Sequence, residues 1–159
     1  MEKGDFQKKE ERKILVFQVA NGELGLDISC VREVLRPQEI YPLPKTPDFI
    51  EGVINLRGHI VALIDLRKRL HGKQTEEPGK RIIICKVNKL IVGLTVNSLK
   101  EIIALSEENI RPTPEVATLQ MEADVTTGLA KIGERIIPIL DLAQIITKKE
   151  ATELSGLER

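Results

Sequence analysis

Aromatic residues are scarce in this chain of 159 residues, which has no tryptophan, three phenylalanines and one tyrosine. Proteins that bind single-stranded nucleic acid use exposed aromatic side chains as stacking platforms, and Phe6, Phe17, Tyr41 and Phe49 are all that this chain offers. Net charge is lacking as well, because 24 basic side chains balance 24 acidic ones. Binding through phosphate neutralisation needs a basic surface, so the composition counts against a nucleic-acid-binding protein.

Cysteine and long apolar runs are scarce too. Cys30 and Cys85 are far apart, lie among apolar neighbours and form no CxxC motif, so we expect two buried thiols and no disulfide scaffold. No apolar run is long enough to span a membrane, and the charged N-terminus has no signal-peptide hydrophobic region. We therefore expect a soluble, cytoplasmic protein without direct membrane insertion.

The residues of a catalytic or metal site are not grouped in the sequence. The two histidines, His59 and His71, have no second ligand at HxxxH or HxxE spacing, and no GxGxxG, P-loop or GxSxG motif occurs. Asp27, Asp65 and Asp141 are explained as turn or helix-capping residues. We predict no enzyme, no metal and no cofactor. An enzyme with an unconventional site around His59 is an alternative, which a His59→Ala variant without a phenotype would remove.

An internal repeat is the main feature that the chain does contain. Residues 14–35 align without a gap on residues 82–103, and residues 52–66 align on residues 128–142, so the offsets are 68 and 76. The first block matches Gly25 with Gly93, and the second block ends in Asp-Leu in both copies. Two ungapped blocks in the same order predict two copies of one unit.

The repeat divides the chain into five segments. These are a charged N-terminal segment 1–13, a first subdomain at about 14–70, a linker 71–81, a second subdomain at about 82–146 and a charged C-terminal tail 147–159. The tails lack strand patterning, and we expect them to be mobile or frayed. The residue order also leaves open an exchange of strands between the two units near residues 72–82.

Each copy is predicted to contain about five short strands and a terminal helix. A β-branched run, a polar turn and a second apolar run form a hairpin at 14–28 and again at 82–96. The next segment fits a helical face or a turn leading into a strand, and we favour the turn and strand because β-branched residues are frequent. Two further strands meet at a tight turn near Gly58, and Pro138 in the second copy indicates an edge strand or a bulge. Short strands with Gly and Pro turns favour a small barrel.

Four stretches resemble the CheW-like family of chemotaxis coupling proteins. They read GELGLDISCVREVL, YPLPKTPDFIEGVINLRGHIVALIDLRKRL, EENIRPTPEV and GLAKIGERIIPILDL, and the resemblance covers about residues 14–146. The run PxFIxGVxNLRGxIxPxxDL is specific, and the chain departs from it only at Ala62, where the run has proline. Because no receiver-domain sequence follows, the chain resembles the single-domain coupler and not the receiver fusion CheV. It does not resemble the kinase CheA, whose regulatory domain of the same fold follows a large catalytic region.

The resemblance implies a fold, a function and partners. The implied fold is mainly β, with two tandem five-stranded SH3-like β-barrels, short helices and a pseudo-twofold internal repeat. The implied function is a non-enzymatic adaptor that couples the cytoplasmic tips of methyl-accepting chemoreceptors to the regulatory domain of the histidine kinase CheA. In the family, barrel ends pack against similar barrels of the kinase, and the groove between barrels takes the receptor's helical hairpin. We expect a monomer when free, recruited to membrane receptor arrays by its partners.

The resemblance and the repeat together nominate partner-binding residues, which are Ile28, Val31, Glu33, Val34, Arg57, Gly58, Val96 and Leu99. For the apolar members, packing in the core is an equal alternative, since buried aliphatic residues dominate any barrel. Glu33 has an equivalent in Glu101, which makes a structural role plausible. Arg57 has Gly133 as its equivalent, so we infer that the barrel does not need an arginine there and that Arg57 serves a partner. A nucleic-acid-binding double β-barrel is the alternative function, and a salt-sensitive mobility shift would favour it.

Overall fold

The computed structural model describes residues 11–20, 22–71, 81–112 and 126–146, and these form a mainly β structure. The strands are β1 (Glu11–Val19), β2 (Gly22–Asp27), β3 (Val31–Leu35), β4 (Ile50–Leu56), β5 (His59–Asp65), β6 (Arg81–Val87), β7 (Leu90–Val96), β8 (Ser98–Ser106), β9 (Ile110–Arg111), β10 (Thr126–Ile132) and β11 (Arg135–Leu140). The helices are α2 (Leu66–His71), α4 (Leu142–Ile145) and the short 3₁₀ helices η1 (Ile28–Cys30) and η2 (Glu107–Asn109).

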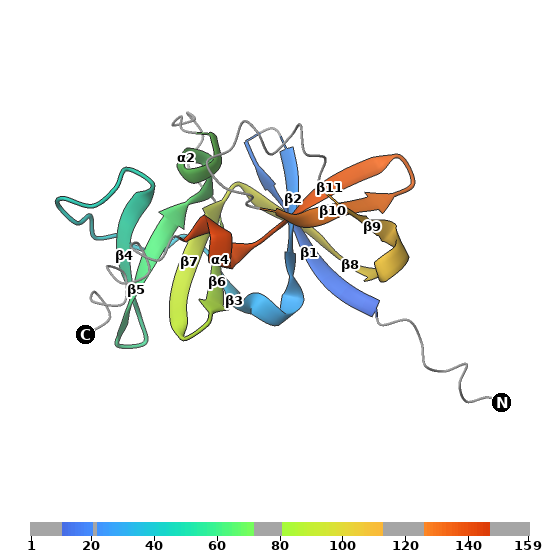
Figure 1. The fold of residues 1–159 in the computed structure, drawn as a ribbon. Coiled ribbons are helices and arrows are strands. Elements are labelled where there is room, and N and C mark those ends of the chain that lie inside the picture. The colour runs from blue at the N-terminus through green and yellow to red at the C-terminus, as the bar shows by residue number, and fades with distance from the viewer. Residues whose placement is uncertain (1–10, 21, 72–80, 113–125, 147–159) are drawn as a thin grey trace.

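The strands form two sheets, which make the two lobes of the molecule (Figure 1). The six-stranded sheet has the order β8-β1-β2-β11-β10-β9, and the five-stranded sheet has the order β3-β6-β7-β5-β4. Neighbouring strands are antiparallel except for two pairs, β2 with β11 and β7 with β5, which are parallel. In the chain, helix α2 directly follows β5 of the five-stranded sheet, and α4 follows β11 of the six-stranded sheet. The Arg69 Nε donates a hydrogen bond of 2.8 Å to the Ile145 carbonyl and so joins the two helices.

The sheets show that the two sequence copies exchange strands. The first hairpin of the chain, β1–β2, lies in the sheet formed by β8 to β11, whereas the second hairpin, β6–β7, lies in the sheet formed by β3 to β5. When repeat-equivalent strands are matched, both sheets have the same strand order, apart from the additional β9. The division at residues 71–81 therefore describes the sequence repeat and does not separate the sheets.

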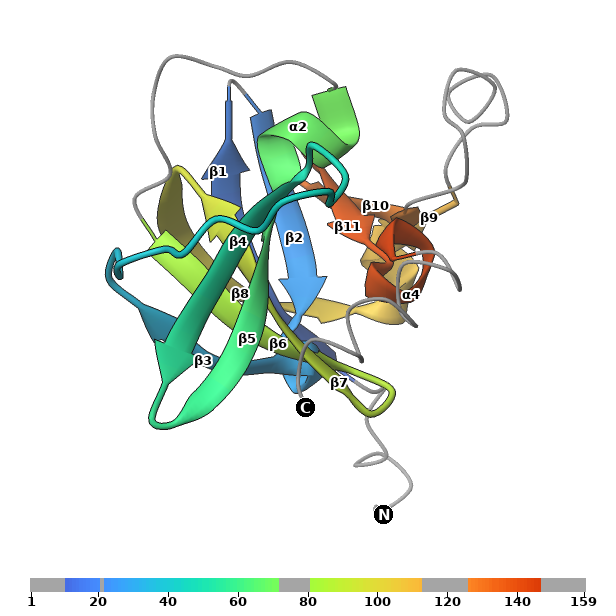
Figure 2. The same ribbon diagram turned by 90° about the vertical axis from the view of Figure 1, so that its left-hand side faces the viewer.

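Neither sheet closes through backbone hydrogen bonds among the described residues, so the predicted barrels are strongly curved open sheets. The two end strands of each sheet are consecutive in the chain: β8 is joined to β9 through η2, and β3 is joined to β4 by residues 36–49. Tyr41 of this connector pairs with Val53 of β4. The Tyr41 N–H donates to the Val53 carbonyl at 2.8 Å, and the Val53 N–H donates to the Tyr41 carbonyl at 2.9 Å. Figure 2 faces this lobe and shows the tip of the β4–β5 hairpin beside β3.

Two glycines of the repeat are fixed by packing. Gly25 of β2 pairs with Ile139 of β11, and Gly93 of β7 pairs with Leu63 of β5, at equivalent register. A Cβ atom at Gly25 would lie 2.5 Å from Ile14 Cγ2, and one at Gly93 would lie 2.4 Å from Leu63 Cδ2. A side chain at either position would therefore overpack the interior of its sheet.

The apolar core has three parts. One cluster fills the six-stranded sheet around Ile14 and Val16, and a second fills the five-stranded sheet around Leu63 and Ile84. The third and most extensive cluster draws residues from both sheets and from both α helices, with Phe17 fully buried in it. Burial of aliphatic surface at this junction holds the two lobes together.

Several local predictions can now be judged. The segment after the first hairpin is a 3₁₀ turn followed by β3, as predicted, and the tight turn at Gly58 is confirmed. The edge-strand prediction for Pro138 is wrong, because β11 lies between β10 and β2, and the register shift of its hairpin is between Thr126 and Gly128. Residues 11–13 were predicted to belong to a mobile N-terminal segment. They belong instead to β1, where they pair with β8. The rest of both tails lies outside the described residues.

Candidate partner-binding surfaces

The NLRG turn is a two-residue hairpin turn with an unusual backbone. Arg57 has a φ of 51° and Gly58 a φ of 89°, so both central residues are left-handed, as in a type I′ turn. Asn55 stabilises this turn, because its Oδ1 accepts a hydrogen bond of 2.8 Å from the Gly58 N–H. A left-handed conformation is costly for a residue with a Cβ atom. The turn thus holds the Arg57 side chain at the exposed tip of the hairpin.

Arg57 forms an ion pair with Glu33 of β3. Since β3 and β4 are the two ends of the five-stranded sheet, this pair bridges the seam where the sheet does not close. The hydrogen bond from Arg57 holds the pKa of Glu33 below its usual value, and the hydrogen bond to Glu33 raises the pKa of Arg57. The pair is exposed to solvent, so its attraction is screened and its contribution to folding is small.

The second copy has an equivalent of this pair at a different position. Arg135 occupies the position of His59, and its Nη2 lies 3.0 Å from an oxygen of Glu101, the equivalent of Glu33. The same Nη2 also lies 3.0 Å from Glu23 of β2. We inferred from Gly133 that the barrel does not need an arginine at the position of Arg57. The structure adds a correction, because in the second copy Arg135, on the other side of the turn, forms the equivalent ion pair with Glu101.

The five-stranded sheet has a surface pocket beside the Arg57 turn. It has a volume of about 380 Å³ and is lined by Arg32, Glu33, Leu56, Arg57, His59, Ile60, Val61, Ile84 and Ile91. Glu33 and Arg57 were predicted from the sequence as partner-binding residues and His59 only as an alternative enzyme site, whereas the other lining residues were not predicted. The repeat holds a signal for the pocket, because it aligns the apolar Ile91 with the charged Glu23. Such a difference between the copies indicates that the two lobes differ at this position.

The remaining predicted residues lie elsewhere. Ile28, Val31 and Leu99 are half-buried and pack on the core between the sheets. Val34 is 38% exposed on the outer side of β3, and Gly58 is exposed at the hairpin tip. Val96 is fully buried, so we assign it to packing between the lobes. The predicted set therefore falls into two groups. The seam group lies on β3 and at the Arg57 turn and consists of Glu33, Val34, Arg57 and Gly58. The junction group lies between the sheets and consists of Ile28, Val31, Val96 and Leu99.

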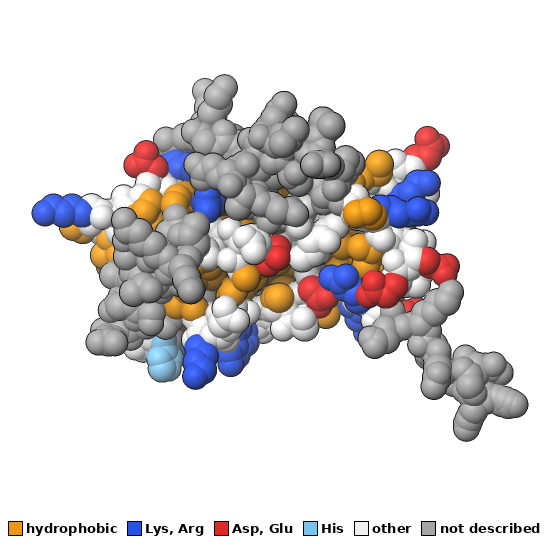
Figure 3. Space-filling view, viewed as in Figure 1, with side chains coloured by type: hydrophobic (Ala, Val, Ile, Leu, Met, Phe, Trp, Pro, Cys, Tyr) orange, Lys and Arg blue, Asp and Glu red, His pale blue; other side chains and the backbone are white. Residues whose placement is uncertain are grey.

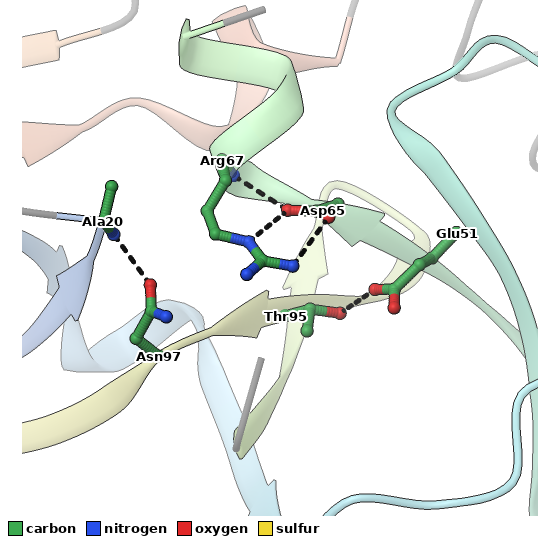
Figure 4. Close-up of polar contacts among 6 residues, drawn as sticks. All are labelled: Ala20, Glu51, Asp65, Arg67, Thr95 and Asn97. Atoms are coloured by element: carbon green, nitrogen blue, oxygen red, sulfur yellow. Dashed lines mark hydrogen bonds and ion pairs between the residues drawn. The ribbon is translucent and has the colours of Figure 1, made fainter. Parts of the chain in front are cut away.

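A buried polar cluster lies where β5, β7 and α2 meet (Figure 4). Arg67 donates from its backbone N–H and its Nε to Asp65 Oδ1, at 3.0 and 3.1 Å, and from Nη2 to Asp65 Oδ2 at 3.1 Å. Both side chains are at most 5% exposed. Thr95, which pairs with Asp65 across the parallel strands, donates a hydrogen bond of 2.6 Å to Glu51. In the second copy Ala143 stands at the position of Arg67, and Asp141 forms the helix cap, in which its Oδ1 accepts from the Ala143 N–H at 3.1 Å.

The crossing from β7 to β8 is fixed by one residue, Asn97. Asn97 lies between these strands, at the point where the chain passes from one sheet to the other, and it is 9% exposed. Its side-chain Oδ1 accepts a hydrogen bond of 2.7 Å from the Ala20 N–H (Figure 4). Its backbone N–H donates to the Gln18 carbonyl at 2.9 Å. The crossing is thereby anchored to the end of β1.

Charge on the face shown in Figure 3 is mixed in sign. The face in Figure 3 carries basic and acidic side chains interspersed with apolar ones. In the described ranges there is no group of three His, Cys, Asp or Glu residues suited to a metal ion. Those ranges also contain no helix of the length and apolarity that crossing a membrane requires.

The fold thus defines a class, that of small β proteins made of two strand-exchanged, strongly curved sheets. Within this class, the CheW-like domain family model matches residues 13–150. The chain is 34% identical over 141 residues to the chemotaxis protein CheW of Klebsiella aerogenes, covering 87% of this chain and 84% of that protein. It is 29% identical over 153 residues to CheW of Treponema pallidum, covering 93% and 89%.

A solved structure agrees with these sequence matches. The crystal structure of scaffolding protein TtCheW from Thermoanaerobacter tengcongensis superposes with a TM-score of 0.78 at 38% identity, covering 89% of this chain and 96% of that one. The chain belongs to the CheW-like domain family. This membership makes it a chemotaxis scaffold and not an enzyme, and it does not favour the alternative of a nucleic-acid-binding protein.

Proposed function

We propose that this chain couples the cytoplasmic tips of chemoreceptors to the regulatory domain of the histidine kinase CheA. The observation that carries the proposal is the match of the family model over residues 13–150, nearly the whole chain. The chain acts in the cytoplasm as a monomer when free, and its partners recruit it to receptor arrays at the membrane. A scaffold with two lobes can hold two partners at once without any catalytic step.

The seam group and the junction group are the two surfaces that we assign to partners. The junction group offers half-buried aliphatic side chains of Ile28, Val31 and Leu99, which suit the apolar face of a helical hairpin. The seam group offers Glu33 and Arg57, a charged pair at the rim of a lobe. Rim charges chiefly set the rate and the specificity of association, while apolar contacts supply most of the affinity.

The experiment is a binding assay with a receptor hairpin fragment and with the CheA regulatory domain, separately and together. We expect Arg57→Glu to fold normally but to weaken the ternary complex, because it places two acids side by side at the seam. Arg57→Gly is the matched variant, since the second copy has Gly133 at this position and glycine accepts the left-handed backbone. Lys131→Glu, on the exposed side of β10, is the control for charge alone.

Each outcome has a distinct meaning. Loss of assembly in Arg57→Glu and a smaller loss in Arg57→Gly support a role of the seam in coupling. Equal weakening of the ternary complex by Lys131→Glu would show a general effect of charge and no specific role of the seam group. Failure of the unmodified chain to bind either partner would overturn the proposed function.

A further inference from the structure

The pocket in the five-stranded sheet has an apolar floor. Val61 and Ile84 are 3% and 1% exposed, and Leu56 and Ile91 are partly buried against the same cluster. Pockets that bind small molecules are concave, largely apolar and carry a few polar groups at defined positions, with volumes of about 300–1,000 Å³. The volume of about 380 Å³ lies in this range and suits a small ligand.

The equivalent region of the other lobe carries an ionic cluster. The repeat places Glu23 at the position of Ile91 and Arg135 at the position of His59. Arg135 reaches Glu23 and Glu101 at 3.0 Å each, so an ionic cluster occupies the place where the five-stranded sheet has its pocket. Two substitutions between otherwise similar copies thus place charged side chains in one lobe where the other has Ile91 and His59.

The rim of the open pocket is cationic. The lining contains two arginines, Arg32 and Arg57, and one acidic residue, Glu33, so it carries one positive charge in excess. Glu33 is already engaged by Arg57. Within the described part of the chain, neither the Arg32 nor the His59 side chain has a hydrogen-bond or ion-pair partner. A guanidinium and an imidazole are therefore available at the edge of an aliphatic floor.

We propose that this pocket binds a small aliphatic carboxylate. The aliphatic stem packs on Val61, Ile84 and Ile91, and the carboxylate accepts hydrogen bonds from Arg32 and His59. Arginine is well suited to this, because its planar donors match the geometry of a carboxylate. The proposal concerns a ligand site and goes beyond the adaptor function, because it requires neither receptor nor kinase.

The test is a titration of the full chain, labelled with ¹⁵N, by four probes that separate head group from stem. Octanoate has both, acetate lacks the stem, and octanol and octylammonium change the head group. We expect saturable shifts with octanoate at amides of β5, β6 and β7, weaker binding of octanol, and no saturable shifts with acetate or octylammonium. Absence of saturable octanoate shifts, or equal binding of octanol and octanoate, would overturn the proposal.

Variants taken from the repeat locate the site. Arg32→Gln should weaken octanoate binding about two- to fivefold, the range of an exposed ion pair. Lys100→Gln, at the equivalent position of the other lobe, should leave it unchanged. Ile91→Glu, which introduces the equivalent residue of the other lobe, should abolish binding, and its thermal unfolding transition tests whether it folds. Equal effects of Arg32→Gln and Lys100→Gln would place the ligand elsewhere. The assay contains no protein partner, so a negative result leaves the adaptor function untouched.

Discussion

The buried ion pair between Asp65 and Arg67 allows a quantitative prediction for Asp65→Asn. The asparagine keeps an oxygen that can accept from the Arg67 N–H, so the helix cap is retained. It loses the negative charge and turns an N–H group towards the Arg67 guanidinium, which then lies buried beside a donor. Both side chains are at most 5% exposed, so water cannot replace the lost acceptor. Removing one partner of such a pair costs about 3–5 kcal/mol.

The second copy supplies the control. Asp141 caps α4 through one hydrogen bond, to the Ala143 N–H, and has no arginine partner at the equivalent position. Asparagine caps helices about as well as aspartate. We therefore expect Asp141→Asn to change the free energy of unfolding by less than about 0.5 kcal/mol. The two variants make the same chemical change at repeat-related positions, so their difference isolates the buried charge pair.

Urea and thermal unfolding, both followed by circular dichroism, measure both variants. For a domain of this size, a loss of about 3 kcal/mol lowers Tm by roughly 6–12 °C. An Asp65→Asn, Arg67→Met double variant should recover part of the loss, because the buried charge is then removed with its partner. Equal midpoints for Asp65→Asn and Asp141→Asn would show that the buried pair contributes nothing beyond a helix cap.

Three further predictions concern packing, acid stability and thiol reactivity. Gly25→Ala should cost about 1–3 kcal/mol, because the new Cβ meets Ile14 Cγ2 at 2.5 Å, whereas Gly22→Ala, with open space, should be nearly neutral in the same urea assay. For Asp27, burial is outweighed by hydrogen bonds from Ser29 and the contact with Arg12, which together lower its folded pKa below 3.8. Its contribution to stability is therefore present at neutral pH and lost as the pH falls below about 4, so Asp27→Asn should flatten the acid limb of the stability profile. Burial raises the pKa of Cys85, so this thiol should react with a disulfide reagent at about pH 8 only after unfolding; rapid reaction of the folded chain would contradict its placement.

The local elements could be predicted because each depends on neighbouring residues. The hairpin turn at Gly58 and the cap at Asp141 follow from short motifs, and the structure has both. The exchange of strands between copies could not be predicted in this way. Both copies have the same apolar pattern, and that pattern fits either partner strand equally well. Which hairpin joins which sheet depends on tertiary packing, such as the Asn97 contacts at the crossing.

The candidate site was predicted less completely than the fold. Comparison of the copies singled out Arg57, but a position-by-position comparison missed that Arg135 supplies the same ion pair from the other side of the turn. The buried pair of Asp65 with Arg67 was missed for a related reason. Charged residues two apart are usually exposed, and only the packing of α2 on β7 shows that these are not.

The Arg57 seam also changes what an alanine scan of this chain would mean. Because Glu33 and Arg57 bind each other in the free chain, removal of either also releases its partner. A double-mutant cycle is therefore needed to separate the direct contact with a protein partner from the release of the pair.

The measurement that tests the coupling function most directly is co-sedimentation of CheA with receptor-containing membranes, with and without this chain. We expect CheA to sediment with the receptors only when the chain is present. We also expect Arg57→Glu to reduce the sedimented CheA, and Lys131→Glu to leave it unchanged. Sedimentation of CheA to the same extent without the chain would contradict coupling, as would a chain that binds the receptors but brings no CheA with it.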